Sequence, residues 1–253
     1  MTTTVPAPAL SPASLRGTLG VQVVEQLGRQ ILAGDVAEGQ QLPTEAELGE
    51  HFGISRTIVR EAIKTLAAKG FVEVRTKTGT RVRPRSDWNL FDPDVLVWQS
   101  DMGVDEEFLR KLVDVRRLIE PGAARLAAQR ITPAIAAALT HAYGDLQAAS
   151  LADDPDAFES ADSRFHTTLL QACGNELLLQ LRRPIDMAVH VGFRTVAQVP
   201  GAFKVSVPLH LAVLTAVVEH RPDEAAAAME YLLGESTEHV KASYAVARRP
   251  RKG

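Results

Sequence analysis

Residues 42–82 read LPTEAELGEHFGISRTIVREAIKTLAAKGFVEVRTKTGTRV, and this stretch decides the fold of the first part of the chain. We expect a short helix after Thr44, because Glu47 three residues later can complete a capping box with it. Gly53 ends that helix, and Ser55 caps the next one. Two short helices joined by a tight turn that contains glycine are typical of a helix-turn-helix.

The segments on either side complete a larger pattern. After the two helices, FVEVR (71–75) and TRVRP (80–84) alternate apolar and polar residues around a short turn, which predicts a small hairpin. Before them, apolar residues recur every four positions between Gly17 and Ala33, which predicts an amphipathic helix. The order of three helices and a hairpin is that of a winged helix-turn-helix.

A basic face on the second helix of the pair indicates a nucleic-acid partner. Arg56, Arg60 and Lys64 follow one line of this helix, and apolar residues form the opposite, inward face. Between residues 56 and 85, nine basic residues stand against two acidic ones. Such a helix can present guanidinium groups to guanine edges or phosphates, although an ordinary solvated basic face has the same pattern.

Residues 42–82 closely resemble the GntR-type winged helix-turn-helix, whose pattern runs LPsE..LA..fgVSR.TVR.AL..L...Glv....g.GtfV. The resemblance implies a bacterial transcription regulator that contacts operator DNA through the second helix and the wing. Some fatty-acid-type members carry an arginine where this chain has Ala46, so we expect a different operator sequence. The expected DNA contacts are the positions that match the family, together with one at the start of the first helix and one in the wing: Ser55, Arg56, Thr57, Arg60, Gly79, Thr44 and Lys77.

Two domains are the natural expectation for 253 residues. Beyond residue 93 the sequence is rich in alanine and shows no strand pattern, which predicts an all-α antiparallel bundle and a mainly α fold class. The expected helices lie near 93–101, 105–130, 132–150, 154–173, 175–197, 203–220 and 222–246. The expected division is a disordered lead-in (1–14), the winged helix-turn-helix (15–84), a linker (85–92), the helical domain (93–246) and a basic tail (247–253).

Composition excludes several classes of protein. The single cysteine, Cys173, excludes an intrachain disulfide and a cysteine-based zinc cluster. The first 14 residues lack a basic start followed by an apolar run, so no signal peptide is predicted. No apolar run is long enough to span a bilayer. We therefore expect a cytoplasmic protein without a membrane partner.

Polar side chains interrupt the apolar faces of three predicted helices in the second half. Arg116 lies on one such face, Asp162 and His166 lie one turn apart on another, and His210 lies on a third. A buried guanidinium requires an anionic partner, either in the protein or on a ligand. One aspartate and two histidines in the same bundle can hold a divalent metal such as zinc, iron, nickel or manganese. The alternative is that Asp162 and His166 hydrogen-bond to each other and to nearby backbone.

Residues from about 93 to 245 resemble the FCD sensing domain of the FadR subfamily. The resemblance rests on VRRLIEPGAARLAAQR, on the Asp-x-x-Phe-His of ADSRFH and on LHLAVLTAVVEHRPDEAAAAMEYLL. It implies that Asp162, His166 and His210 bind a divalent metal, which we expect to be zinc. The family's fourth ligand falls on or beside Leu232, which cannot coordinate. The predicted site therefore has three protein ligands, completed by water or by the effector.

The stretch DWNLFDPDVLVWQ (87–99) resembles part of the FadR-type regulators of sugar-acid catabolism. The resemblance implies an aldonate effector of the galactonate type, with its carboxylate on the metal or on Arg116. Its hydroxyl groups are expected on Asn175, His190 and Arg194, residues chosen from their helix positions. We expect a homodimer that binds a pseudo-palindromic operator and leaves it when the acid binds.

Two other functions remain open at this point. An aspartate with two histidines also describes catalytic zinc and non-haem iron sites, so a metal-dependent enzyme is the main alternative. Against it, the sequence shows no convincing general base, nucleophile motif or glycine-rich phosphate loop, and we expect no catalytic residue. A constitutive architectural DNA binder is the third interpretation. The inward polar groups argue against it, because a purely structural bundle rarely keeps so many.

Overall fold

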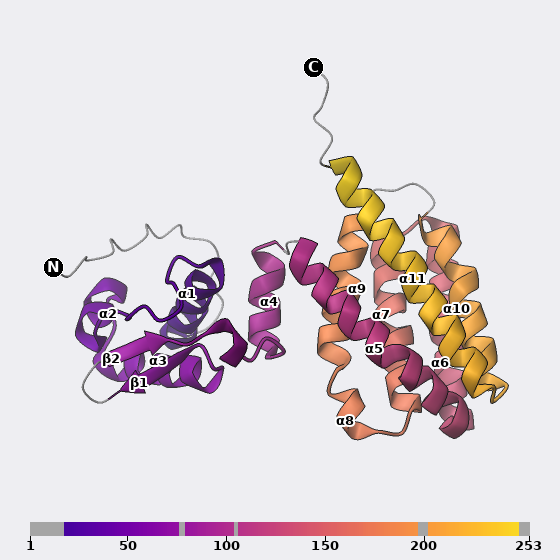
Figure 1. The fold of residues 1–253 in the computed structure, drawn as a ribbon, viewed down its shortest axis with the longest axis horizontal. Helices are drawn as coiled ribbons and strands as arrows, with labels where there is room; N and C mark the ends of the chain where they lie inside the picture. Colours follow the sequence, from indigo (N-terminus) through magenta and orange to yellow (C-terminus); the bar gives the residue numbers. More distant parts are fainter. Residues whose placement is uncertain (1–17, 76–78, 104–105, 197–201, 248–253) are drawn as a thin grey trace, which may run out of the picture. The chain divides into compact units, whose positions relative to one another are not determined.

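The computed structural model describes residues 18–75, 79–103, 106–196 and 202–247. The chain divides into two compact units, Met1–Gly103 and Val104–Gly253 (Figure 1). Each unit has its own apolar core, and the two are described separately. No helix among the described residues combines the length and apolar character needed to cross a membrane.

The first unit has the predicted order of three helices and a hairpin. Its elements are α1 (Leu19–Ala33), α2 (Glu45–Phe52), α3 (Arg56–Ala68), β1 (Val72–Arg75), β2 (Gly79–Val82), a 3-10 turn (Arg85–Asp87) and α4 (Pro93–Asp101). The strands are antiparallel, with Val72 opposite Val82 and Arg75 opposite Gly79. This arrangement confirms the winged helix-turn-helix.

Local capping fixes the two helices of the helix-turn-helix. The Thr44 hydroxyl accepts a hydrogen bond from the Glu47 amide at 3.3 Å, and the Glu47 carboxylate accepts one from the Thr44 amide at 2.7 Å. The predicted capping box is therefore present. Gly53 has a φ of 65°, a left-handed conformation that glycine adopts without strain. Ser55 then caps α3 by accepting from the Ile58 amide.

Helix α4 packs within the first unit, whereas we expected residue 93 to begin the second domain. The Trp98 ring is buried against Gly28 of α1, where a Cβ atom would lie 2.3 Å from Trp98 Cζ3. The buried Lys69 ammonium pairs with Asp92 at 2.6 Å and Asp94 at 2.7 Å at the start of α4. These contacts hold α4 on the winged helix, so the boundary between compact units falls after Gly103.

The second unit is helical throughout the part that the structure describes. Its elements are α5 (Glu106–Arg130), α6 (Pro133–Ala152), α7 (Pro155–Ala172), α8 (Glu176–Leu179), α9 (Arg182–Val196), α10 (Ala202–Val218) and α11 (Pro222–Ala247). Helices α5 and α11 pack closely together, as do α6 and α7 (Figure 1). Alanine, leucine and phenylalanine side chains fill the core between these helices.

The prediction of one helix over 175–197 was wrong. The structure has the short α8 and then the longer α9, with a break at Gln180 and Leu181. Asn175 caps α8 by accepting from two backbone amides. Pro184 lies in the first turn of α9, where a proline is tolerated because its missing N–H has no partner there in any helix. The turn is therefore encoded locally, by a cap and a helix-starting proline.

We predict that Gly28→Ala lowers the free energy of unfolding of the first unit by about 1–3 kcal/mol, because the added methyl group overpacks against Trp98. Trp88 and Trp98, the two tryptophans of the chain, both lie in this unit, so their fluorescence in a denaturant titration reports on it.

Gly144→Ala in α6 is the control, since a Cβ there meets nothing within 4 Å among the described residues. It should stabilise the second unit by about 0.5–1 kcal/mol, measured by circular dichroism. If Gly28→Ala does not change the unfolding transition measured by tryptophan fluorescence, the close packing of α1 on α4 is contradicted.

Candidate functional site

Helix α3 has the two faces that DNA reading requires. Val59, Ala62, Ile63 and Leu66 are buried in the core of the first unit. Ser55, Arg56 and Thr57 are exposed at the start of the helix, and Arg60 and Lys64 continue the same face. The inward face anchors α3 while the outward face presents two guanidinium groups to solvent, so this surface is the candidate DNA interface.

The exposed basic residues differ in the partners they hold in the free protein. The Arg60 guanidinium donates to both carboxylate oxygens of Glu45, at 3.1 and 2.8 Å, and lowers the pKa of that carboxyl. Exposed pairs of this kind contribute about 1 kcal/mol or less, so a DNA phosphate can replace Glu45. Arg56 forms no direct ion pair among the described residues, although its charge also contributes to the lowered pKa of Glu45.

The remaining DNA-contact candidates are Thr44, Gly79 and Lys77, and the first two lie in different surroundings. Thr44 is exposed, but its hydroxyl both accepts from and donates to Glu47 in the capping box. Gly79 begins β2 with a φ of 77°, and a Cβ there would lie 2.8 Å from the Gln41 side chain. The left-handed φ explains why glycine occupies the wing position, because the end of the Gln41 side chain could move aside whereas an L side chain would be strained at this φ. Lys77 lies outside the described residues.

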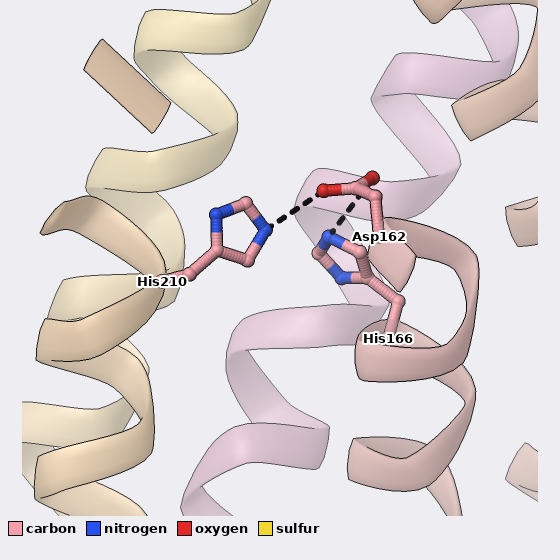
Figure 2. Close-up of side chains that lie close together, drawn as sticks. All are labelled: Asp162, His166 and His210. Carbon is pink, nitrogen blue, oxygen red and sulfur yellow. Dashed lines mark ion pairs between the residues drawn. The ribbon is translucent and has the colours of Figure 1, made fainter. Parts of the chain in front are cut away.

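In the second unit, Asp162, His166 and His210 come together as the helical spacing predicts (Figure 2). Their potential ligand atoms all lie within 4.8 Å of one another, and both histidines are buried. The Asp162 carboxylate lies 2.9 Å from His210 Nε2 and 3.8 Å from His166 Nε2. The latter distance is too long for a hydrogen bond, so a simple Asp162–His166 pair does not describe the geometry.

Two residues of α5 extend this group into a buried polar cluster, which we define as Arg116, Glu120, Asp162, His166 and His210. The Arg116 guanidinium donates to Glu120 Oε1 at 2.5 Å and lies 3.0 Å from His166 Nε2. The other Glu120 oxygen lies 2.5 Å from His166 Nδ1. The cluster therefore joins α5, α7 and α10 at one buried point.

These partners show where one hydrogen lies on each imidazole. A backbone carbonyl only accepts, so His210 Nδ1, 2.9 Å from the Ser206 carbonyl oxygen, carries the hydrogen. A guanidinium only donates, so His166 Nε2 accepts from Arg116 and the hydrogen lies on Nδ1, facing Glu120. His166 Nε2 therefore carries a lone pair, and His210 Nε2 faces the Asp162 carboxylate at 2.9 Å; both Nε2 atoms lie on the Asp162 side of their rings (Figure 2).

This arrangement fits a divalent cation. His210 Nε2 is buried with a carboxylate oxygen of Asp162 2.9 Å away, so a ligand nitrogen and a ligand oxygen already face each other. Two neutral imidazoles and a carboxylate are suitable ligands for zinc and related metals. Glu120 stands beside the far nitrogen of His166, where a carboxylate orients a metal-binding imidazole.

The carboxylates of the cluster remain ionised. Burial raises the pKa of Glu120, but Arg116 and His166 outweigh it and lower the pKa to about 2. Burial likewise raises the pKa of Asp162, yet the two histidines and Arg116 hold it well below its ordinary value. The permanent charges of the cluster are the two carboxylates and the Arg116 guanidinium, so two negative charges face one positive charge, and the imidazoles or a bound cation supply the balance.

The expected effector residues lie in other surroundings. Asn175 caps α8 with its side-chain oxygen, and the His190 imidazole lies 2.5 Å from Glu159 rather than with the metal-ligand group. The side chain of Arg194 lies outside the described residues. Arg116 is buried, as predicted, but the structure gives it protein partners. Leu232 is buried in the apolar core of the unit.

Sequence reasoning missed two acidic residues near the site. Glu120 follows Arg116 by four positions, and this helical spacing could have identified it as the required anionic partner. Asp186 of α9 accepts hydrogen bonds from Ser163 at 2.8 Å and Thr167 at 3.1 Å, both on α7. No pattern in the sequence connects these two helices.

We predict that Glu120→Gln lowers the free energy of unfolding of the second unit by about 3 kcal/mol or more near pH 7, because it leaves the charge of Arg116 buried without its partner. The Glu120 pKa is lowered from 4.5 to about 2 on folding. Its contribution is therefore fully present above pH 4.5 and is lost as the pH falls toward 2.

Denaturant titrations of the wild type and Glu120→Gln between pH 7 and pH 2 test this prediction. The difference between their free energies of unfolding should become smaller below pH 4.5. Glu107→Gln is the control, since Glu107 forms an exposed pair with Lys111 on the same helix and should cost less than about 1 kcal/mol. A gap that stays constant with pH would show that Glu120 contributes no charge-dependent stability.

Comparison with known proteins identifies the type of each unit. Residues 19–82 match the family described as bacterial regulatory proteins, gntR family, and residues 111–235 match the FCD domain. The galactonate operon transcriptional repressor of Escherichia coli K12 is 34% identical over 221 residues, covering 87% of this chain and 96% of the repressor. The NanR repressor of Cronobacter sakazakii is 31% identical, covering 85% of this chain and 82% of NanR.

A solved structure supports the fold alone. Lar, described as controlling the Listeria monocytogenes agr system, covers 90% of this chain and 99% of its own chain with a TM-score of 0.63 and 19% identity. The matched families and curated relatives are transcriptional regulators and not enzymes, which excludes the metal-dependent enzyme that the aspartate and histidines left open. The chain is a transcriptional regulator that belongs to the gntR family of bacterial regulatory proteins, with an FCD domain as its second unit.

Proposed function

We propose that this protein is a homodimeric, cytoplasmic repressor that leaves its operator when a sugar acid of the aldonate class binds to the helical unit. The buried polar cluster carries the sensing part of the proposal. Burying a charged group costs several kcal/mol, and a bundle with only a structural role gains little from placing two carboxylates and a guanidinium beside two buried imidazoles. A ligand-responsive site gives these residues a use.

DNA binding is assigned to α3 and the wing. Ser55, Arg56, Thr57 and Arg60 are expected to contact the major groove and its flanking phosphates, and the wing with Gly79 and Lys77 to reach the minor groove. Thr44 stands at the start of α2, where a helix N-terminus favours a phosphate. A homodimer would present two such surfaces to a pseudo-palindromic operator. Operator DNA lies in the bacterial cytoplasm, which is the reason for that location.

The effector class rests on resemblance and on chemistry. The related Escherichia coli protein is named for the galactonate operon, and residues 87–99 resemble the regulators of sugar-acid catabolism. The cluster offers two ways to bind a carboxylate, through the Arg116 guanidinium or through a divalent metal, zinc in our proposal, held by Asp162, His166 and His210.

Release from DNA then requires differential binding. The acid can shift the protein away from its operator only if it binds the DNA-incompetent state more tightly than the competent one. Its hydroxyl groups would meet polar side chains around the cluster. Asn175, His190 and Arg194 are the candidates from the sequence, and Asp186 with its two hydroxyl partners is an additional one from the structure.

The DNA-reading assignment predicts that Arg56→Ala weakens specific operator binding by about 1–3 kcal/mol. Fluorescence anisotropy with DNA from upstream of the protein's own gene, repeated across a salt series, measures this. If Arg56 contacts a phosphate, the slope of the logarithm of the affinity against the logarithm of the salt concentration should decrease in magnitude by about one. Arg110→Ala, which removes an exposed arginine of α5, is the control and should leave the affinity unchanged. Equal losses in both variants would argue against α3 as the reading helix.

The sensing assignment predicts that a change in the buried polar cluster affects release by the acid but not operator binding. His166→Ala should bind the operator as the wild type does but should lose release by the acid, because His166 belongs to the cluster and not to the DNA-binding unit. A panel of aldonates, with and without zinc, is added to the preformed complex. If the protein binds DNA specifically but no acid alters that binding, the assignment as a regulator stands and the proposed effector class is wrong.

A further inference from the structure

The Arg116 guanidinium lies where it affects both of the groups that the proposed function needs. It is buried, donates to Glu120 Oε1 at 2.5 Å and contacts His166 Nε2 at 3.0 Å. Since a guanidinium cannot accept a hydrogen bond, this contact uses the Nε2 lone pair. That lone pair is the one through which His166 would bind a metal beside Asp162.

A divalent cation and Arg116 cannot use this lone pair together. One nitrogen lone pair serves one partner, and two positive charges at one buried point repel each other. Glu120, by contrast, has a separate oxygen for each neighbour, Oε1 for Arg116 and Oε2 for His166 Nδ1. Arg116 can therefore leave His166 while it remains bound to Glu120.

We propose that Arg116 is a resident cation that exchanges with the divalent metal at His166 and is thereby released to bind the effector carboxylate. Without metal, Arg116 covers His166 Nε2 and supplies positive charge to the acidic cluster. With metal, the guanidinium keeps Glu120 and has N–H groups free for a carboxylate, which it can hold in a bidentate fashion. The carboxylate step rests on the proposed function, whereas the exchange at His166 does not.

The exchange implies that metal and acid support each other. Both favour the state in which Arg116 has left His166, so by linkage each must raise the affinity for the other by the same factor. Arginine suits this role better than lysine, because its planar fork can hold Glu120 and His166 at once. A lysine has a single ammonium group, which the Glu120 carboxylate would attract away from the neutral imidazole.

Titration of the full-length protein with Co²⁺ alone, followed by its absorption spectrum, and with Zn²⁺ in competition tests the exchange. Arg116→Gln and Arg116→Lys should both bind metal more tightly than the wild type, by about tenfold or more, the value of one charge-assisted hydrogen bond. Arg130→Gln is the control. It removes another arginine of α5, whose guanidinium donates to the Cys173 carbonyl, and should leave metal affinity unchanged.

The two variants separate exchange from simple charge removal. If only Arg116→Gln gains affinity, the cause is the lost positive charge, and the exchange is refuted. If neither variant gains affinity, Arg116 does not compete with the metal, and the proposal also fails. Arg116→Lys keeps a positive charge beside the buried Glu120 carboxylate. Its metal affinity can therefore be measured even if Arg116→Gln does not fold.

D-Galactonate tests the second half, with galactitol as the matched compound that lacks the carboxylate. In the wild type, saturating galactonate should raise Co²⁺ affinity about fivefold or more, and galactitol should not. Both Arg116 variants should lose this coupling. If galactonate leaves the wild-type metal affinity unchanged while the variants bind metal more tightly, the exchange stands and the effector class of the proposed function is wrong.

Discussion

The second unit depends on charge buried at one point between its helices. Arg116 and Glu120 of α5, His166 of α7 and His210 of α10 are all buried. Removing the guanidinium and the carboxylate from water costs several kcal/mol each, and removing the imidazoles also costs free energy unless they are hydrogen-bonded. The cost is offset only when the partners meet at hydrogen-bonding distance. We infer that this requirement fixes the register of three helices, because alanine- and leucine-rich faces alone permit many packings.

The same point gives the unit its chemical selectivity. The core holds two carboxylates, Glu120 and Asp162, and one guanidinium, Arg116, so its permanent charges sum to one negative charge. Such a site attracts cations. It would bind an organic anion only after a metal has added positive charge or after the Arg116 guanidinium has become available. In the exchange that we propose, a metal and Arg116 compete for His166, and the observed basis for it is the 3.0 Å contact between the guanidinium and His166 Nε2.

The first unit is built on a different principle. Its core is apolar, and its charges lie outside, on the exposed face of α3 and in exposed pairs such as Arg60–Glu45. The exception is Lys69, buried between Asp92 and Asp94 beneath the Trp98 ring, which fastens α4 to the winged helix. Helix α4 therefore belongs to the same compact unit as the DNA-reading helix.

The sequence by itself determined the local structure: the capping box at Thr44 and Glu47, the left-handed Gly53, the cap at Ser55 and the inward face of α3 are short-range effects of neighbouring residues. It also placed Asp162 and His166 on one helical face, because that face is set by a spacing of four. The tertiary structure alone decided which partners those faces meet. The contact of Arg116 with His166 and the docking of Trp98 on Gly28 join segments separated by 50 and 70 positions, and α4 joined the first unit for the same reason. Helical periodicity specifies a direction for each side chain, but the neighbour in that direction depends on how helices pack, and packing is a property of the whole core.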